Sequence, residues 1–76
     1  MPPSVTRTVV TLSGRVQAVG FRQTVLEIAA RYPVAGTVRN LRRGGLEIDA
    51  EGEDGVLAAF LDDVLAHLHQ EAAAAS

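Results

Sequence analysis

The sequence predicts an α+β fold in which an antiparallel sheet carries two helices on one face. Three observations lead to this class. The 76 residues leave room for a single domain, 1–76. Segments with strand and helix periodicity follow in the order strand, helix, strand, strand, helix. A glycine pair between the last two strand segments is typical of a tight hairpin. The order βαββα is most of a ferredoxin-like unit, with the last strand missing.

The first half of the chain predicts one strand and one helix. Residues Arg7–Ser13 are rich in β-branched side chains, which favour a strand. Ser13–Gly20 holds two glycines and predicts a loop. Apolar residues then recur at helical spacing until Pro33, which cannot continue a helix. These apolar residues are Phe21, Val25, Ile28, Ala29 and Tyr32.

The second half predicts a hairpin and a second helix. Val34–Leu41 has a strand-like pattern that Gly36 interrupts, and Arg42–Gly45 ends in two glycines that predict the turn. In the next segment apolar and acidic residues alternate, which indicates a strand with one buried face. Asp54 can cap the following helix. The apolar residues of that helix are Val56, Leu57, Phe60, Leu61, Val64, Leu65 and Leu68.

Composition excludes several classes of protein. Apolar residues make up 47% of the chain and charged residues 21%, which is a globular and not a disordered composition. The chain contains no cysteine, so disulfides and thiolate metal sites are excluded. No apolar run approaches the length that spans a membrane, and we expect no membrane partner and a cytoplasmic location.

The charges divide sharply along the chain. All seven basic residues lie at or before Arg43, and from Gly44 onward there are eight acidic residues and no basic one. Such a division could concentrate positive potential where the loops of the first half converge, which suits an anionic ligand. Alternatively, the acidic residues are only the solvated faces of one strand and one helix.

The segment Gly14–Arg22, GRVQAVGFR, is the first candidate for chemistry. It connects a strand to a helix and ends with Arg22, which we expect in the first turn of that helix. Amides at a helix start lack partners within the helix, and the helix dipole adds positive character there. A guanidinium can then pair with two phosphate oxygens. The alternative is a tight connection with an exposed arginine. The GK[ST] ending of a nucleotide-binding P-loop is missing.

The sequence resembles the acylphosphatase family in two separate segments. The family's first signature has the form G-x-V-Q-G-V-x-F-R, and its second has the form G-x-V-x-N-x-x-D-G-x-V-E. The resemblance covers roughly Arg7 to Leu68. The matching residues are Gly14, Val16, Gln17, Val19, Phe21 and Arg22 in the first signature, and Gly36, Val38, Asn40, Gly44 and Glu47 in the second.

Three departures from the family pattern stand out. Ala18 replaces a usual glycine, so this position must reach its conformation with a Cβ atom, at a cost of about 1 kcal/mol or more if φ is positive. Arg43 replaces the aspartate of the hairpin turn, which we expect to alter the turn and not the site. The family's last strand has no counterpart after Leu68.

The resemblance implies an enzyme that hydrolyses acyl phosphates to a carboxylate and inorganic phosphate, with no metal and no cofactor. It implies that Arg22 binds the substrate phosphate and that Asn40 holds the attacking water. Without the surrounding signature, Asn40 would be read as a strand-end residue that bonds to its own backbone. Candidates for the phosphate cradle are the amides of Gln17, Ala18, Val19, Gly20, Phe21 and Arg22.

Two other functions remain as alternatives. The first is a non-catalytic module that binds phosphate or carbamoyl phosphate through the same loop. The second is a ferredoxin-like RNA-binding domain, which is disfavoured because the strands lack stacking aromatic residues and the chain has a net charge of −2; we expect no nucleic-acid partner. His67 and His69 lie two positions apart on a predicted helix and therefore diverge.

The missing last strand predicts an open sheet edge. In a ferredoxin-like arrangement that strand pairs beside the first one, so the strand Arg7–Ser13 would have unpaired backbone groups. We therefore expect weak self-association through this edge, or its partial cover by the second helix.

Overall fold

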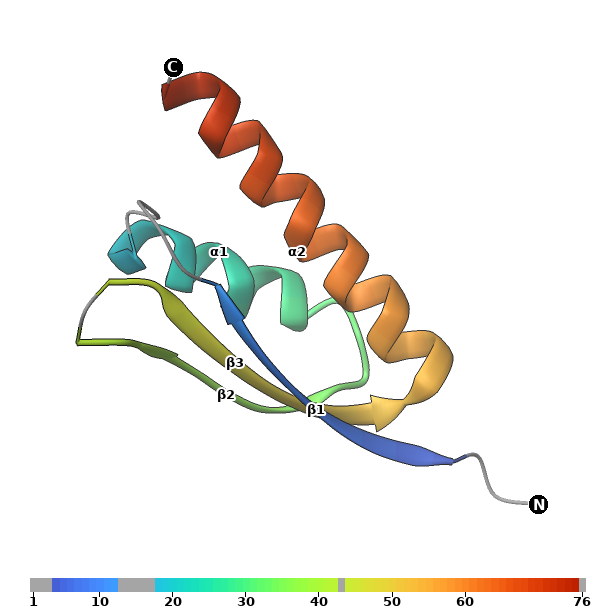
Figure 1. Ribbon diagram of the computed structural model, residues 1–76. Helices are drawn as coiled ribbons and strands as arrows, with labels where there is room; N and C mark the ends of the chain where they lie inside the picture. The colour runs from blue at the N-terminus through green and yellow to red at the C-terminus, as the bar shows by residue number, and fades with distance from the viewer. Residues whose placement is uncertain (1–3, 13–17, 43, 76) are drawn as a thin grey trace.

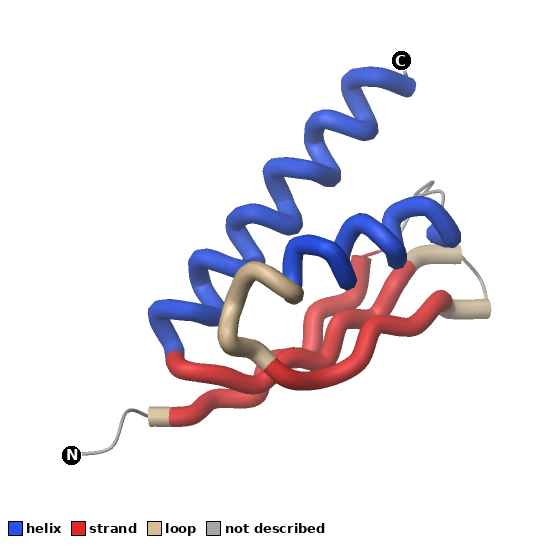
Figure 2. Tube along the Cα trace, turned by 180° about the vertical axis from the view of Figure 1, so that it is seen from behind, coloured by secondary structure: helices blue, strands red, loops and turns tan. Residues whose placement is uncertain are grey.

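A computed structural model describes residues 4–12, 18–42 and 44–75. Within these residues the chain forms β1 (Val5–Leu12), α1 (Ala18–Ala29), β2 (Ala35–Asn40), β3 (Leu46–Glu53) and α2 (Asp54–Ala75). The strands make one antiparallel sheet in the order β1-β3-β2, and both helices lie over the same face of it (Figures 1 and 2). The predicted ferredoxin-like α+β class, with order βαββα and no last strand, is confirmed.

The element boundaries lie close to the predicted ones except at the starts of β1 and α1. The strand β1 begins at Val5, two residues before the predicted start at Arg7. The helix begins at Ala18, so the predicted loop is wrong for residues 18–20, while residues 13–17 lie outside the described residues. Gly20 suggested a loop, but a glycine is tolerated near a helix start, where tertiary packing of the following apolar residues decides. At its other end α1 closes with a tight turn ahead of Pro33, in which the Tyr32 amide donates to the Ala29 carbonyl at 3.1 Å.

The hairpin between β2 and β3 depends on its two glycines. Gly44 and Gly45 have φ values of 89° and 98°, a region that side chains disfavour. The Leu41 amide donates to the Gly45 carbonyl at 3.1 Å, which closes the hairpin. The predicted turn is therefore confirmed, although Arg43 lies outside the described residues.

Gly36 does not interrupt β2, contrary to the sequence pattern. The strand runs through it with a φ of 146°. A Cβ atom at this position would lie 1.8 Å from the backbone carbonyl oxygen of Asp49 on β3. The glycine is therefore required because the two backbones approach each other too closely for any side chain.

The core lies between β3 and the two helices. Nine hydrophobic residues of the described part of the chain are buried, and they come from α1, β3 and α2, while the edge strands contribute only half-buried residues such as Val10 and Val38. Tyr32 links the helices at the rim of the core, with its ring edge-on to Phe60 and its hydroxyl donating to Asp63 at 3.0 Å. The buried residues are Phe21, Val25, Ile28, Leu46, Ile48, Ala50, Leu57, Phe60 and Val64.

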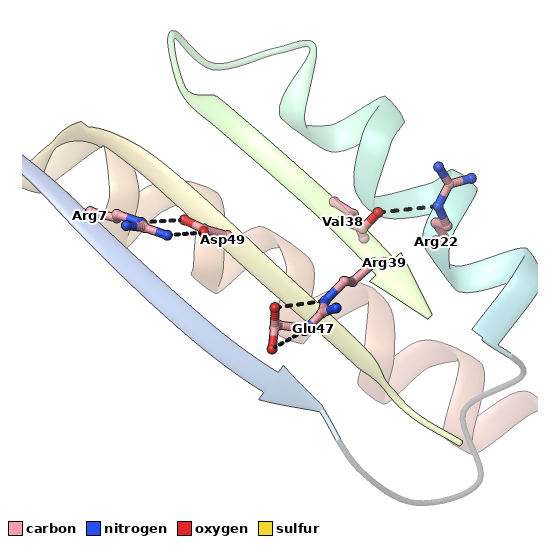
Figure 3. Close-up of polar contacts among 6 residues, drawn as sticks. All are labelled: Arg7, Arg22, Val38, Arg39, Glu47 and Asp49. Atoms are coloured by element: carbon pink, nitrogen blue, oxygen red, sulfur yellow. Dashed lines mark hydrogen bonds and ion pairs between the residues drawn. The ribbon is translucent and has the colours of Figure 1, made fainter. Parts of the chain in front are cut away.

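The face of the sheet that the helices do not cover carries ion pairs between basic residues of the first half of the chain and acidic residues of the second half. Arg7 on β1 pairs with Asp49 through contacts of 2.9 and 2.5 Å, and Arg39 on β2 pairs with Glu47 at 2.9 Å (Figure 3). Both acidic partners lie on β3, the central strand. The division into a basic and an acidic half therefore reflects, at these four residues, cross-strand pairs on a solvated face, as the alternative interpretation expected.

The Arg7–Asp49 pair predicts an acid-dependent component of stability. The hydrogen bond from Arg7 lowers the pKa of Asp49 below its ordinary value of 3.8, although partial burial acts in the opposite direction. A carboxyl with a lowered pKa stabilises the fold above the ordinary pKa, and this contribution is lost as pH falls through the lowered value. Arg7→Gln should therefore raise the Asp49 pKa, measured by NMR titration, and reduce the loss of stability in acid.

Arg31→Gln provides the matched control for this titration, because Arg31 makes no ion pair with the described residues. It should leave the Asp49 pKa at the wild-type value. An unchanged pKa in Arg7→Gln would show that the pair does not persist in solution.

Candidate active site

The strand register brings the two sequence signatures to the same end of the sheet. Leu46 on β3 lies opposite Leu12 of β1 on one side and opposite Asn40 of β2 on the other. The connection to α1 leaves the sheet after Leu12, and Asn40 is the last residue of β2. The start of α1 and the end of β2, whose last residue is Asn40, therefore lie at the same end of the sheet although they are about 20 residues apart in the chain (Figure 1).

The start of α1 offers backbone amides that have no partner within the helix at this end of the sheet. Ala18, Val19, Gly20 and Phe21 are the first four residues of the helix, and the amides of a first turn have no acceptor within the helix. All four are predicted cradle residues. Gln17, the fifth, lies outside the described residues. Ala18 has helical backbone, so the strain expected from a positive φ does not arise at this position.

Gly20 leaves open space next to these amides. It is exposed, and a Cβ atom placed on it would meet no atom of the described residues within 4 Å. Its carbonyl oxygen accepts a hydrogen bond from the Thr24 hydroxyl at 3.2 Å, one turn along the helix. Packing therefore does not require a glycine here, and the open space is available to a ligand that approaches the backbone closely.

Arg22 is held against the edge of β2. It is the fifth residue of α1, one turn beyond the start and not in the first turn as predicted. Its Nε–H donates to the Val38 carbonyl oxygen at 3.3 Å, and its two Nη atoms point away from the strand (Figure 3). The preceding residue, Phe21, is fully buried, so Arg22 extends outward from a fixed helix face. The two Nη groups of the guanidinium thus remain available to bind an anion through two contacts.

Asn40 lies two residues beyond Val38 on β2. Alternate residues of a strand share a face, so Asn40 is on the helix-bearing face with Val38, which packs against the core. Two residues of a strand span about 6.6 Å, so Asn40 lies about that distance along β2 from the residue whose carbonyl holds Arg22. The exposed Asn40 side chain forms no hydrogen bond with the described residues, so its backbone-bonding alternative gains no support.

Val38 is a contributor that the sequence reasoning missed. It acts through its backbone carbonyl, which orients Arg22. Any residue carries a carbonyl, so residue identity gives no signal for such a role. Only the position of Val38 inside the second signature, two residues before Asn40, could have suggested it.

Other chemical features lie away from this end of the sheet. A hollow of about 90 Å³ beneath Leu26 is largely apolar and includes Val38 among its lining residues but neither Arg22 nor Asn40. The described residues contain no cluster of three or more His, Cys, Asp or Glu suited to a metal ion. His67 bonds to the Asp63 carbonyl at 2.9 Å on its own helix, while His69 is exposed. None of the described helices is long and apolar enough to cross a membrane.

The fold and this geometry define a class: small ferredoxin-like domains with a helix start, an arginine and an asparagine arranged to receive an anion. Residues 8–75 match the family of acylphosphatases. The chain belongs to the acylphosphatase family. This confirms the resemblance seen in the sequence.

Curated relatives support the same family. An acylphosphatase from Methanospirillum hungatei is 52% identical over 50 residues, which is 66% of this chain and 55% of the relative. One from Pediococcus pentosaceus is 50% identical over 54 residues, 71% of this chain and 60% of the relative. One from Clostridium acetobutylicum is 38% identical over 58 residues, 76% of this chain and 64% of the relative. The matched part thus spans about 55–64% of these relatives' length. No solved structure matched the chain.

Proposed function

We propose that the protein hydrolyses acyl phosphates to a carboxylate and inorganic phosphate. The single observation that carries this proposal is the register that brings Asn40 to the end of the sheet where α1 begins. Family membership supports the reaction class, and the relatives that the chain resembles are named acylphosphatases. Neither family membership nor these relatives' names favour a non-catalytic module.

In this mechanism the helix start and Arg22 bind the phosphoryl group. The amides of Val19, Gly20 and Phe21 donate to its oxygens, and the partial positive charge of the helix start favours the dianion. The two Nη groups of Arg22 donate to two of the phosphoryl oxygens, while its Nε stays bonded to the Val38 carbonyl. Charge stabilisation of this kind is the principal contribution to catalysis of phosphoryl transfer.

Asn40 positions the attacking water in line with the bond to the leaving carboxylate. The water oxygen forms the new bond to phosphorus, and the bond between phosphorus and the acyl oxygen breaks. The electron pair of that bond leaves with the carboxylate, which is a weak base and needs no general acid. The proton of the water passes to a phosphoryl oxygen. The products are one carboxylate and one inorganic phosphate.

The direct test is turnover of benzoyl phosphate by the purified chain in the presence of a chelator. We expect benzoate and inorganic phosphate in equal amounts, at a rate that the chelator does not change. Phosphate binding without turnover would instead favour the non-catalytic module. A rate abolished by the chelator and restored by a divalent metal would contradict the metal-independent mechanism.

Gly20→Ala should lower the affinity for phosphate without lowering the stability of the fold. The added methyl group enters open space in the first turn of α1, so the free energy of unfolding should stay the same or rise by up to about 1 kcal/mol. The same methyl group occupies the space through which a phosphate would approach the amides. We therefore expect phosphate affinity to fall by about tenfold or more, measured by inhibition of turnover or by calorimetry.

Gly55→Ala is the matched control. Gly55 lies in the first turn of α2, at the opposite end of the sheet, and a Cβ atom there also meets no atom within 4 Å. It should show a similar change in stability and wild-type phosphate affinity. Equal affinity in both variants would place the phosphate away from the start of α1.

A cytoplasmic location, the absence of a nucleic-acid partner and the role of each site residue remain predictions of the sequence. The assay with benzoyl phosphate does not test the location or the absence of a nucleic-acid partner. Variants at Gly20, Arg22 and Asn40 test the roles of these three residues.

A further inference from the structure

A hollow of about 90 Å³ lies between α1 and β2, next to the proposed phosphate site. Val38 belongs to both, because it lines the hollow and its carbonyl oxygen accepts the hydrogen bond from Arg22 (Figure 3). Leu26 and Ala29 follow Arg22 by four and seven positions, so they lie on the same face of α1, and both line the hollow. The hollow therefore extends from the Arg22 contact along β2 toward the start of that strand.

Small residues leave this space open. Gly36 and Ala50 lie opposite each other on β2 and β3, and both line the hollow. Together with Ala29 they contribute at most a methyl group each to a space that larger side chains would fill. The strand β1 contributes none of the lining residues that the structure describes, so a strand added beside β1 would leave the hollow unchanged.

The lining of the hollow is apolar and uncharged. Asp49 borders it through its backbone, because its carboxylate binds Arg7 on the other face of the sheet. Thr37 alternates with Val38 along β2, so its side chain is directed to that other face as well. An uncharged aliphatic group can therefore enter this space, whereas a carboxylate would lose its hydration there without gaining a partner.

The in-line geometry of the proposed reaction directs the leaving group toward this hollow. The attacking water and the leaving oxygen lie on opposite sides of phosphorus. Asn40 and the hollow lie on opposite sides of the Arg22 contact along β2. With the water held at Asn40, the acyl group extends from phosphorus past Val38 and into the hollow.

We propose that the hollow binds the acyl group of the substrate and selects short, uncharged aliphatic acyl phosphates. This subsite rests on the proposed function, whose substrate class it narrows. An apolar cavity of about 150 Å³ holds benzene with its six carbons, so a hollow of about 90 Å³ holds roughly three to four. The butyryl group, with three carbons beyond its carboxyl carbon, matches this volume. Leu26 and Ala29 then determine which chain length fits.

A series of acyl phosphates tests the subsite with the purified chain, by release of inorganic phosphate. We expect kcat/KM for butyryl phosphate to exceed that for acetyl phosphate by at least about tenfold, because two more methylene groups leave water. Octanoyl phosphate should gain nothing over butyryl phosphate, because its distal carbons lie beyond the hollow.

Two variants change the volume of the hollow in opposite directions. Ala29→Leu fills it and should lower kcat/KM for butyryl phosphate to the level of acetyl phosphate. Leu26→Ala widens it and should shift the preference from butyryl to hexanoyl phosphate, and the 38% exposure of Leu26 lets the fold tolerate this change. The ratio of two substrates within one variant does not depend on how much of the protein is folded.

Leu65→Ala is the matched control. Leu65 is similarly exposed, at 43%, and lines a second apolar hollow of about 90 Å³ between β1 and α2. This variant should keep the wild-type preference among acyl phosphates. Equal shifts in Leu26→Ala and Leu65→Ala would overturn the subsite, as would equal kcat/KM for acetyl and butyryl phosphate in the wild type. Either result leaves the proposed function intact, whereas no turnover of any acyl phosphate would contradict that function.

Stable phosphonates test the subsite without turnover. By calorimetry, pentylphosphonate should bind at least about tenfold more tightly than methylphosphonate. Its analogue with a terminal carboxylate, 5-phosphonopentanoate, should bind no more tightly than methylphosphonate. Pentylphosphonate, but not inorganic phosphate, should shift the NMR signals of the Leu26 and Ala29 methyl groups. Equal affinities for all three phosphonates, or methyl shifts confined to other residues, would overturn the subsite.

Discussion

Replacing Asn40 with alanine is expected to reduce the turnover of benzoyl phosphate by about two to three orders of magnitude. The affinity for inorganic phosphate should remain close to that of the wild type. The physical reason is that the two sides of the site have different roles. The helix start and Arg22 hold the phosphate, while Asn40 contacts only the water. Steady-state kinetics and inhibition by phosphate measure the two quantities on the same samples.

Arg22→Ala provides the contrast, because it should lose both turnover and phosphate affinity. Arg22→Lys keeps the charge but loses the bidentate contact and the hydrogen bond from Nε to Val38, so it should recover only part of either quantity. Wild-type turnover in Asn40→Ala would falsify its role as the residue that positions water. A loss of phosphate affinity in Asn40→Ala as large as in Arg22→Ala would assign Asn40 to binding instead.

Replacing Gly36 with alanine is expected to cost about 3 kcal/mol or more of unfolding free energy. The added Cβ atom would lie 1.8 Å from the Asp49 carbonyl oxygen and 2.8 Å from the carbonyl carbon. Both atoms belong to the backbone of the central strand and cannot move aside as a side chain would. The φ value of 146° adds strain of its own. Chemical denaturation followed by circular dichroism measures the loss.

This cost is a large part of the total, since a domain of this size is stable by about 4–11 kcal/mol. At the lower end of this range Gly36→Ala is partly unfolded even without denaturant, and at the upper end it stays folded with a lower denaturation midpoint. Gly55→Ala, the same substitution at an open position of α2, should keep or slightly raise the stability. A Gly36→Ala variant as stable as Gly55→Ala would mean that β2 and β3 are farther apart in solution.

The local patterns predicted the elements well. Alternation identified β3, whose apolar residues are the buried ones, and helical spacing identified the core residues Phe21, Val25 and Ile28 of α1. The pair of glycines predicted a tight hairpin turn, and both glycines have positive φ values in that turn. These features depend on one residue and its near neighbours, so they can be seen in the sequence.

The errors arose where a glycine's role depends on a distant segment. Gly20 was expected in a loop and lies in a helix, and Gly36 was expected to interrupt a strand that runs through it. Glycine signals backbone freedom in general but does not say whether the reason is a turn, a ligand or a neighbouring backbone. The Asp49 carbonyl that explains Gly36 lies 13 positions away in the sequence.

The sequence by itself determined the order of the elements, most residues of the core, the family, and Arg22 and Asn40 as candidates for the site, because side-chain pattern and chemistry are properties of the chain. Leu65 of α2 is the exception in the core, because it is 43% exposed. The tertiary structure alone decided what strand pairing controls. It set the sheet order β1-β3-β2, the register that brings Asn40 to the end of the sheet where α1 begins, and the Val38 carbonyl that orients Arg22. The reason is that pairing is made by backbone groups, which are the same in nearly every residue and leave no trace in residue identity.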